Sequence, residues 1–132
     1  MQLTYHVNAP VTAIEMAEVF KSSGIKRPVD DLARIEAMLD ASPLVISVRD
    51  QDRLVGIARS LTDFCYCCYL SDLAVSKEYQ AAGIGSALLD ATKKEIGEQC
   101  ALILLSAPGA MDYYPKVGFQ HASNAFIIPR NR

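Results

Sequence analysis

The hydrophobic pattern changes period in the stretch Val75-Ser76-Lys77-Glu78-Tyr79-Gln80-Ala81-Ala82-Gly83-Ile84-Gly85-Ser86. Residues 66–75 form a long β-favouring run, whereas from Gly83 to about Gly97 the apolar residues share one helical face. A strand that turns through small residues into a helix directs successive backbone N–H groups at one point, at the positive end of the helix dipole. The stretch therefore predicts a site for an anion such as phosphate.

Two common phosphate-binding turns fit these residues poorly. A dinucleotide fingerprint needs a third glycine at the position that Leu88 occupies. A P-loop needs Gly-Lys-Ser/Thr, but Gly85 is followed by Ser86 and Ala87. A loop with glycines at a helix start and no ligand remains open as an alternative.

The rest of the chain predicts one domain, residues 1–132, of interleaved strands and helices. Strands are expected at 3–7, 44–48, 54–61, 66–75 and 101–105, with a bent strand or hairpin at 119–128. Helices are expected at about 12–22, from residue 30, at 83–97 and at 108–117. The predicted fold class is α/β (α+β), with about four helices and a mostly antiparallel mixed sheet of about six to seven strands. A strand, helix, strand succession from 66 to 105 adds one parallel pair.

Composition limits the partners that we expect. The 132 residues are 51% hydrophobic and 21% charged, which suits a single domain with a core. Thirteen basic and fifteen acidic residues supply no global field for nucleic acid or anionic lipid, so a polyanion must be bound locally. The N-terminus lacks the features of a secretory signal and no apolar run is long enough to span a membrane. We expect a cytoplasmic protein without nucleic-acid or membrane partners.

The cysteines do not predict a metal site. They are Cys65, Cys67, Cys68 and Cys100. A structural zinc site needs two spaced pairs of ligands, and only His6 and His121 remain to complete one. Thiols in a β-favouring run behave as small buried hydrophobes, and we interpret the cluster at 65–68 in this way.

Two motifs resemble signatures of the GNAT N-acetyltransferase superfamily. The pattern Gln80-x-x-Gly83-x-Gly85, at the end of a strand, resembles the turn whose amides hold the pyrophosphate of coenzyme A (CoA) in that family. Residues 110–119, AMDYYPKVGF, are similar to the family's second signature, Ala-x-x-Phe-Tyr-x-x-x-Gly-Phe. The resemblance extends over nearly the full chain and implies the family's fold, with acetyl-CoA as cosubstrate. By this resemblance the cofactor-binding residues are Leu73, Ala74, Val75, Gln80, Ala81, Ala82, Gly83, Ile84, Gly85 and Ser86.

Acetyl transfer to an amine requires three events: the amine loses a proton, the thioester oxygen is stabilised, and the leaving thiolate is protonated. The resemblance implies a backbone N–H near Leu73 for the second and the phenol of Tyr114 for the third. Packing alone remains the alternative role for Tyr114. Asp72, or a water molecule that it orders, is the candidate base, and Tyr69 and Asp63 are rivals.

The acceptor site is less defined. GNAT members usually wall it with the first two helices and the last strands, which implies Arg27 and Phe126 as pocket residues. Asp63 and Tyr69 suit a cationic primary amine: a small metabolite, a peptide N-terminus or a lysine side chain. We expect an N-acetyltransferase that works by direct attack in a ternary complex. A non-catalytic CoA-binding sensor or interaction module is the alternative, and the resemblance allows a homodimer, since family members commonly dimerise through late strands.

Overall fold

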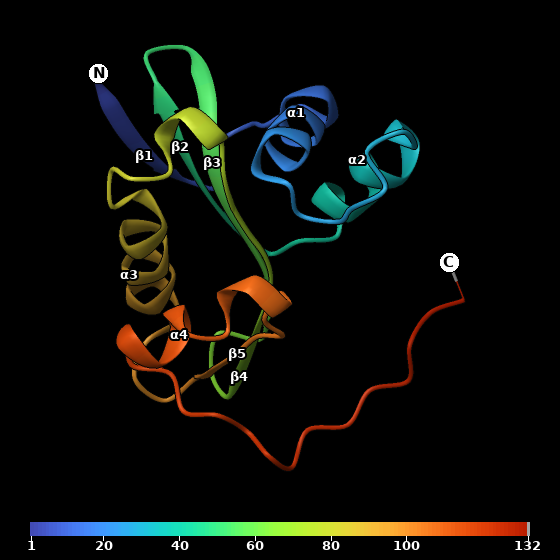
Figure 1. Cartoon of the computed structure of the whole chain (residues 1–132), viewed down its shortest axis with the longest axis vertical. Coiled ribbons are helices and arrows are strands. Elements are labelled where there is room, and N and C mark those ends of the chain that lie inside the picture. Colours follow the sequence, from blue (N-terminus) through green and yellow to red (C-terminus); the bar gives the residue numbers. More distant parts are fainter. Residues whose placement is uncertain (132) are drawn as a thin grey trace.

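Within residues 1–131, which the computed structural model describes, five strands form one sheet in the order β1-β2-β3-β4-β5 (Figure 1). The strands are β1 (Leu3–Val7), β2 (Leu44–Asp50), β3 (Arg53–Thr62), β4 (Cys67–Val75) and β5 (Ala101–Ile103). The helices are α1 (Ala13–Ser23), α2 (Leu32–Asp40), α3 (Ile84–Ile96) and α4 (Tyr113–Lys116), with short 3-10 helices η1 (Lys77–Tyr79) and η2 (Pro108–Ala110). Strands β1 to β4 pair antiparallel and β5 pairs parallel to β4, which confirms the predicted fold class.

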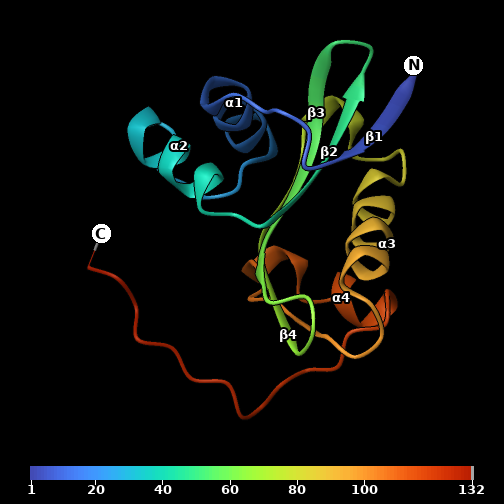
Figure 2. The ribbon, with the colours of Figure 1, turned by 180° about the vertical axis from the view of Figure 1, so that it is seen from behind.

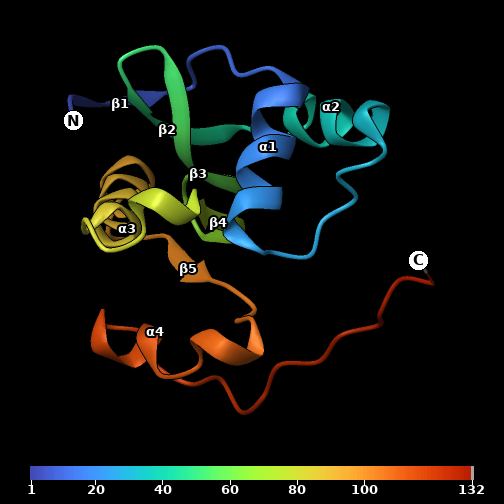
Figure 3. The same cartoon turned by 45° about the horizontal axis from the view of Figure 1, so that its top comes forward.

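Helices cover both faces of the sheet, with α1 and α2 on one face and α3 on the other (Figure 3). Because side chains alternate along a strand, neighbouring residues enter different cores. The core beneath α3 includes Leu44, Ile46, Val48, Val55, Ala58, Leu70, Ile84 and Leu88. The core beneath α1 and α2 includes Met16, Phe20, Ile35, Val45, Leu54, Ile57 and Ala74.

Local signals in the sequence place the helix ends. The Thr12 hydroxyl accepts the N–H of Glu15 at 3.1 Å, and the Glu15 carboxylate accepts the N–H of Thr12 at 3.0 Å, which completes the capping box that opens α1. Gly24, with φ 85°, ends the helix in the left-handed conformation. In the described part of the chain, no helix is both long and apolar enough to cross a membrane.

The segment after α4 departs from the prediction. The bent strand or hairpin expected at 119–128 is absent from the described residues, so the sheet has five strands rather than six to seven. Residues 120–131, here called the C-terminal arm, run away from the body of the domain (Figures 1 and 2). A β-favouring pattern does not by itself supply a neighbouring strand, and the arm forms no ladder with β5.

Candidate active site

Strand β4 contains a β-bulge at Ser71. Arg59 of β3 pairs with Asp72, whereas the next residue of β3, Ser60, pairs with Leu70. Ser71 is therefore an extra residue that has no partner in β3.

The bulge changes which face of the sheet the side chains occupy. Before it, Leu70 belongs to the core beneath α3. After it, Ala74 belongs to the core beneath α1 and α2, and Leu73 packs against the α3 side. The one-residue insertion reverses the alternation, and Asp72 is thereby turned towards the loop between α1 and α2.

Beyond the bulge, one edge of β4 pairs with no strand among residues 1–131, and we call it the free edge. The parallel pairing with β5 covers three residues and ends at Tyr69 and Ile103. The N–H of Ser76 donates to the carbonyl of Val55 in β3 at 2.8 Å. Because N–H groups of a strand point alternately to its two edges, those of Leu73 and Val75 face the free edge. Two backbone donors thus lie where the sheet opens between β4 and β5.

The turn after β4 exposes further donors at the start of α3. Gly83 takes φ 74°, a left-handed conformation that glycine adopts without steric cost. The first bond of the helix runs from the N–H of Ala87 to the carbonyl of Gly83 at 3.1 Å, so the N–H groups of residues 84–86 precede the ladder. Among the described residues, no side chain caps this helix. Its N-terminus therefore presents amides in the arrangement that the sequence predicts for an anion.

Side chains fasten this turn to its surroundings. The Gln80 amide Nε2 donates to the carbonyl of Val75 at 3.0 Å, which links the turn to the strand end. The N–H of Lys77 donates to the hydroxyl of Ser22 in α1 at 2.9 Å. Gln80, expected from the resemblance to bind the cofactor, thus holds the shape of the turn in this structure.

The side chain of Tyr113 in α4 reaches the start of α3. A Cβ on Gly85 would meet the hydroxyl of Tyr113 at 3.5 Å, an ordinary contact distance. The ring of Tyr114 packs edge-on against Tyr113 at 5.2 Å and against Phe119 at 5.4 Å, measured between ring centroids. Burial raises the pKa of Tyr114, and the neighbouring Tyr113 raises it further, so this phenol keeps its proton at neutral pH.

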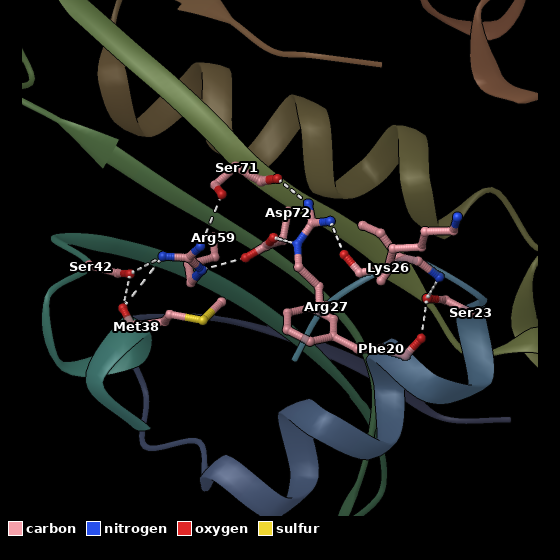
Figure 4. Close-up of polar contacts among 10 residues, drawn as sticks. Phe20, Ser23, Lys26, Arg27, Met38, Ser42, Arg59, Ser71 and Asp72 are labelled. Atoms are coloured by element: carbon pink, nitrogen blue, oxygen red, sulfur yellow. Dashed lines mark hydrogen bonds and ion pairs between the residues drawn. The ribbon is translucent and has the colours of Figure 1, made fainter. Parts of the chain in front are cut away.

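A buried carboxylate lies on the other side of the bulge (Figure 4). The Nε of Arg27 donates to Oδ1 of Asp72, and the Nε of Arg59 donates to Oδ2. Asp72 has no exposed side-chain surface, and the Arg59 side chain is 7% exposed. We call Arg27, Arg59, Ser71 and Asp72 the Asp72 clasp.

The clasp also contacts the helices outside the sheet. The Nη1 of Arg59 donates to the hydroxyl of Ser42 at 3.1 Å and to the carbonyl of Met38 at 3.4 Å, at the end of α2. The Nη1 of Arg27 donates to the carbonyl of Lys26 at 2.6 Å. The carboxylate therefore joins β3, β4 and the α1–α2 connection in one network.

The other residues predicted for the site lie in three different places. Arg27 and Tyr69 lie beside the bulge. Oδ1 of Asp63 accepts the backbone N–H groups of residues 65, 66 and 67 at 2.8–3.1 Å, which lowers the pKa of Asp63 to about 2 and gives it a role in the β3–β4 turn. Phe126 is 99% exposed on the C-terminal arm and walls no pocket in this chain, because the expected last strand is absent.

The cysteines agree only partly with the sequence interpretation. Cys68 in β4 is buried, as expected of a small hydrophobe in a strand, and Cys100, just before β5, is also buried. Cys65 is exposed because β4 starts later than predicted and the turn at Asp63 occupies 63–66. Cys67, the first residue of β4, is exposed as well. Within residues 1–131, no three His, Cys, Asp or Glu side chains are grouped so as to hold a metal ion.

Sequence reasoning missed Arg59 and Ser71. Arg59 was detectable in principle, because a charged residue inside the apolar run at 54–61 must find a partner when the strand is buried. Ser71 carried no such signal, since nothing local distinguishes it from a regular strand residue.

Sequence comparisons identify relatives of this chain. A family model described as acetyltransferase (GNAT) domain matches residues 10–127. The chain is 26% identical over 116 residues to the uncharacterised N-acetyltransferase ycf52 of Porphyra purpurea, covering 83% of this chain and 65% of that protein. It is 24% identical to GCN5-related N-acetyltransferase 2, chloroplastic, of Arabidopsis thaliana, covering 81% of this chain and 43% of that protein. The chain therefore spans only about two thirds or less of these relatives.

Solved structures have the same fold. A Staphylococcus aureus protein of unknown function superposes with a TM-score of 0.83 at 22% identity, covering 98% of this chain and 100% of that one. The aminoglycoside N-acetyltransferase AAC(6')-Iy in complex with CoA superposes with a TM-score of 0.71 at 13% identity, covering 99% of this chain and 96% of that one. Because the family model matches residues 10–127, which is nearly the whole chain, this chain belongs to the GNAT acetyltransferase domain family.

Proposed function

We propose that this protein transfers the acetyl group of acetyl-CoA to a primary amine, by direct attack within a ternary complex. One observation carries the proposal: the free edge of β4 beyond the bulge leads directly into the uncapped start of α3. Along the chain, the outward N–H groups of Leu73 and Val75 are thus followed by the unbonded amides of residues 84–86, which supports one continuous row of donors.

An extended cofactor suits such a row of donors. The amides at the start of α3 bind the pyrophosphate, because oriented N–H groups and the helix dipole favour negative charge there. The pantetheine arm follows the free edge of β4, and the N–H of Leu73 donates to the oxygen of the thioester. This local field explains how a chain with a formal net charge of -2 takes a phosphate-rich ligand.

The acetyl group then passes directly from the thioester to the amine. The amine nitrogen attacks the thioester carbon, a C–N bond forms, and the C–S bond breaks. Tyr114 gives its phenolic proton to the leaving thiolate, and the phenolate recovers a proton from solvent. The Leu73 N–H stabilises the negative charge that develops on the oxygen.

A water molecule is our candidate for the base. Both oxygens of Asp72 are occupied by guanidinium groups and the side chain is inaccessible, which speaks against direct proton transfer from the amine. Water in the opening between β4 and β5 removes the proton, beside Tyr69. The proposed acceptor remains a primary amine of a small molecule, a peptide N-terminus or a lysine side chain.

Thermal unfolding with acetyl-CoA, CoA and NAD side by side tests the cofactor. A ligand present at 100 times its Kd stabilises the folded state by about 2.7 kcal/mol. We expect stabilisation by both CoA species, and a gain with NAD alone would refute the proposal. Release of free CoA is then followed across a panel of amines. A protein that binds CoA but shows no release above hydrolysis with any acceptor is a sensor or interaction module instead.

We also propose a homodimer in which the C-terminal arm of one copy pairs with β5 of another. In the described part of the chain no strand pairs with the outer edge of β5, and the side chains of Ile103 and Leu105 beside it are 49% and 54% exposed. Phe126 and Ile128 of the arm are 99% and 96% exposed and share one face of an extended chain. Each molecule thus carries both an apolar, β-favouring segment without a neighbour and an edge that such a segment can extend.

A further inference from the structure

The β4 bulge is held from outside its own strand. Ser71 has no partner in β3, so the regular ladder does not determine the orientation of its peptide groups. The carbonyl and the hydroxyl of Ser71 instead accept hydrogen bonds from the two arginines of the clasp. The Nη2 of Arg27 donates to the Ser71 carbonyl at 2.7 Å, and the Nη2 of Arg59 donates to the Ser71 hydroxyl at 2.9 Å.

The same two arginines converge on one carboxylate. Asp72 follows the bulge residue directly and receives the Nε of both Arg27 and Arg59 (Figure 4). Each arginine therefore bridges the bulge residue and its neighbour with two different nitrogens, which is a rigid arrangement for a planar guanidinium. Together they fix two successive residues of β4 against the α1–α2 connection and β3.

The bulge determines which way the backbone N–H of Leu73 points. The extra residue decides which edge of β4 the next N–H groups face, and Leu73 comes immediately after Asp72. If the bulge were lost, the register beyond it would slip by one residue and the N–H of Leu73 would turn from the free edge towards β3. A small displacement of a preorganised donor is costly, because the donor must meet the oxygen on which charge develops.

We propose that Arg27, Asp72 and Arg59 are positioning residues that hold the β4 bulge so that the Leu73 N–H meets the thioester oxygen of acetyl-CoA. This inference rests on the proposed function and gives Asp72 a different role from that of a base. It also makes the connection between α1 and α2, which carries Arg27, part of the device that sets the reaction geometry.

Backbone amide NMR separates this role from a merely structural one. In the wild-type protein, the Leu73 amide resonance should shift more with acetyl-CoA than with CoA, because only acetyl-CoA offers the thioester oxygen. In Asp72→Asn this difference should disappear, while the Kd for CoA measured by calorimetry stays within about twofold, because the amides at α3 are untouched. With an accepted amine from the panel, kcat should fall about 10- to 100-fold with little change in the KM for acetyl-CoA.

Two further variants guard against misfolding and general destabilisation. Arg27→Lys keeps the charge and the Arg59–Asp72 pair but loses the bond to the Ser71 carbonyl. It should reduce the difference between the Leu73 amide shifts caused by acetyl-CoA and by CoA. Ile35→Val shortens a buried side chain in the core beneath α1 and α2 without touching the clasp, and it should leave that difference intact. Equal Leu73 shifts with acetyl-CoA and CoA in the wild type, or a full difference in both clasp variants, would overturn the inference. Failure of the wild type to bind CoA would instead refute the proposed function.

Discussion

Arg59 and Asp72 face each other across β3 and β4 at the residue pair next to the bulge, and both side chains are almost completely buried. A buried charge pair contributes little net stability when it is intact, but removing one partner leaves the other uncompensated. Here the second guanidinium, from Arg27, increases that imbalance, because two cations depend on one carboxylate.

Asp72→Asn should therefore lower the free energy of unfolding by about 3–5 kcal/mol, measured by denaturant titration. The matched control is Glu78→Gln, which breaks the exposed Arg53–Glu78 pair and should change stability little. Similar losses in the two variants would contradict the assignment of Asp72 to a buried network.

Tyr114→Phe should separate catalysis from binding. The variant keeps the ring contacts with Tyr113 and Phe119 but removes the proton donor, so we expect kcat for acetyl transfer to fall about 100-fold or more. The affinity for acetyl-CoA should stay nearly unchanged. Tyr66→Phe, at an exposed position in the β3–β4 turn, serves as the control. Unchanged turnover in Tyr114→Phe would restrict Tyr114 to packing.

Gly56→Ala should disturb the start of α3. A Cβ at this position would lie 2.7 Å from Cγ1 of Val48 and 3.3 Å from Cγ2 of Ile84, the first residue of the helix. We expect a loss of about 1–3 kcal/mol in unfolding free energy from overpacking, together with weaker CoA binding in calorimetry. Gly109→Ala places a Cβ in open space and should do neither. Wild-type CoA affinity in Gly56→Ala would show that the phosphate site tolerates movement of α3.

Acid should weaken the contact between α1 and β2. Hydrogen bonding from Arg49 lowers the pKa of Glu15 to about 2, from an ordinary value of 4.5. Because the pKa of Glu15 is lower in the folded than in the unfolded protein, its ion pair with Arg49 stabilises the fold above about pH 4.5. This stabilisation is lost as pH falls towards 2. Glu15→Gln should flatten the dependence of unfolding free energy on pH in that window. An unaltered acid slope in Glu15→Gln would count against the ion pair.

Local and non-local features differ in how far the sequence reveals them. The helix that starts near Thr12 and the turn through small residues into α3 depend on residues within a few positions, and the sequence predicts both. The side of the sheet that Asp72 faces depends on a bulge held by Arg27, 45 positions away along the chain. Hydrophobic alternation contains no trace of such a contact, so the sequence leaves Asp72, or a water molecule that it orders, as the candidate base.

The C-terminal arm illustrates the same limit and supplies the last prediction. Its β-favouring residues suggested a strand, but a strand also requires an edge to pair with, and this chain alone does not bring the arm to β5. If the edge belongs to a second copy, light scattering after gel filtration should give a dimer mass. Phe126→Ser combined with Ile128→Ser should give the mass of a monomer, because the double variant removes both apolar side chains from that face of the arm.

Ile103→Lys should have the same effect from the opposite side of the interface, because a charge on β5 discourages edge pairing. Asn124→Ser changes an exposed polar residue of the arm and should leave the dimer intact. A monomer mass for the wild type at all concentrations would reject the pairing between copies. A dimer that survives both the arm and the β5 substitutions would place the interface elsewhere on the molecule.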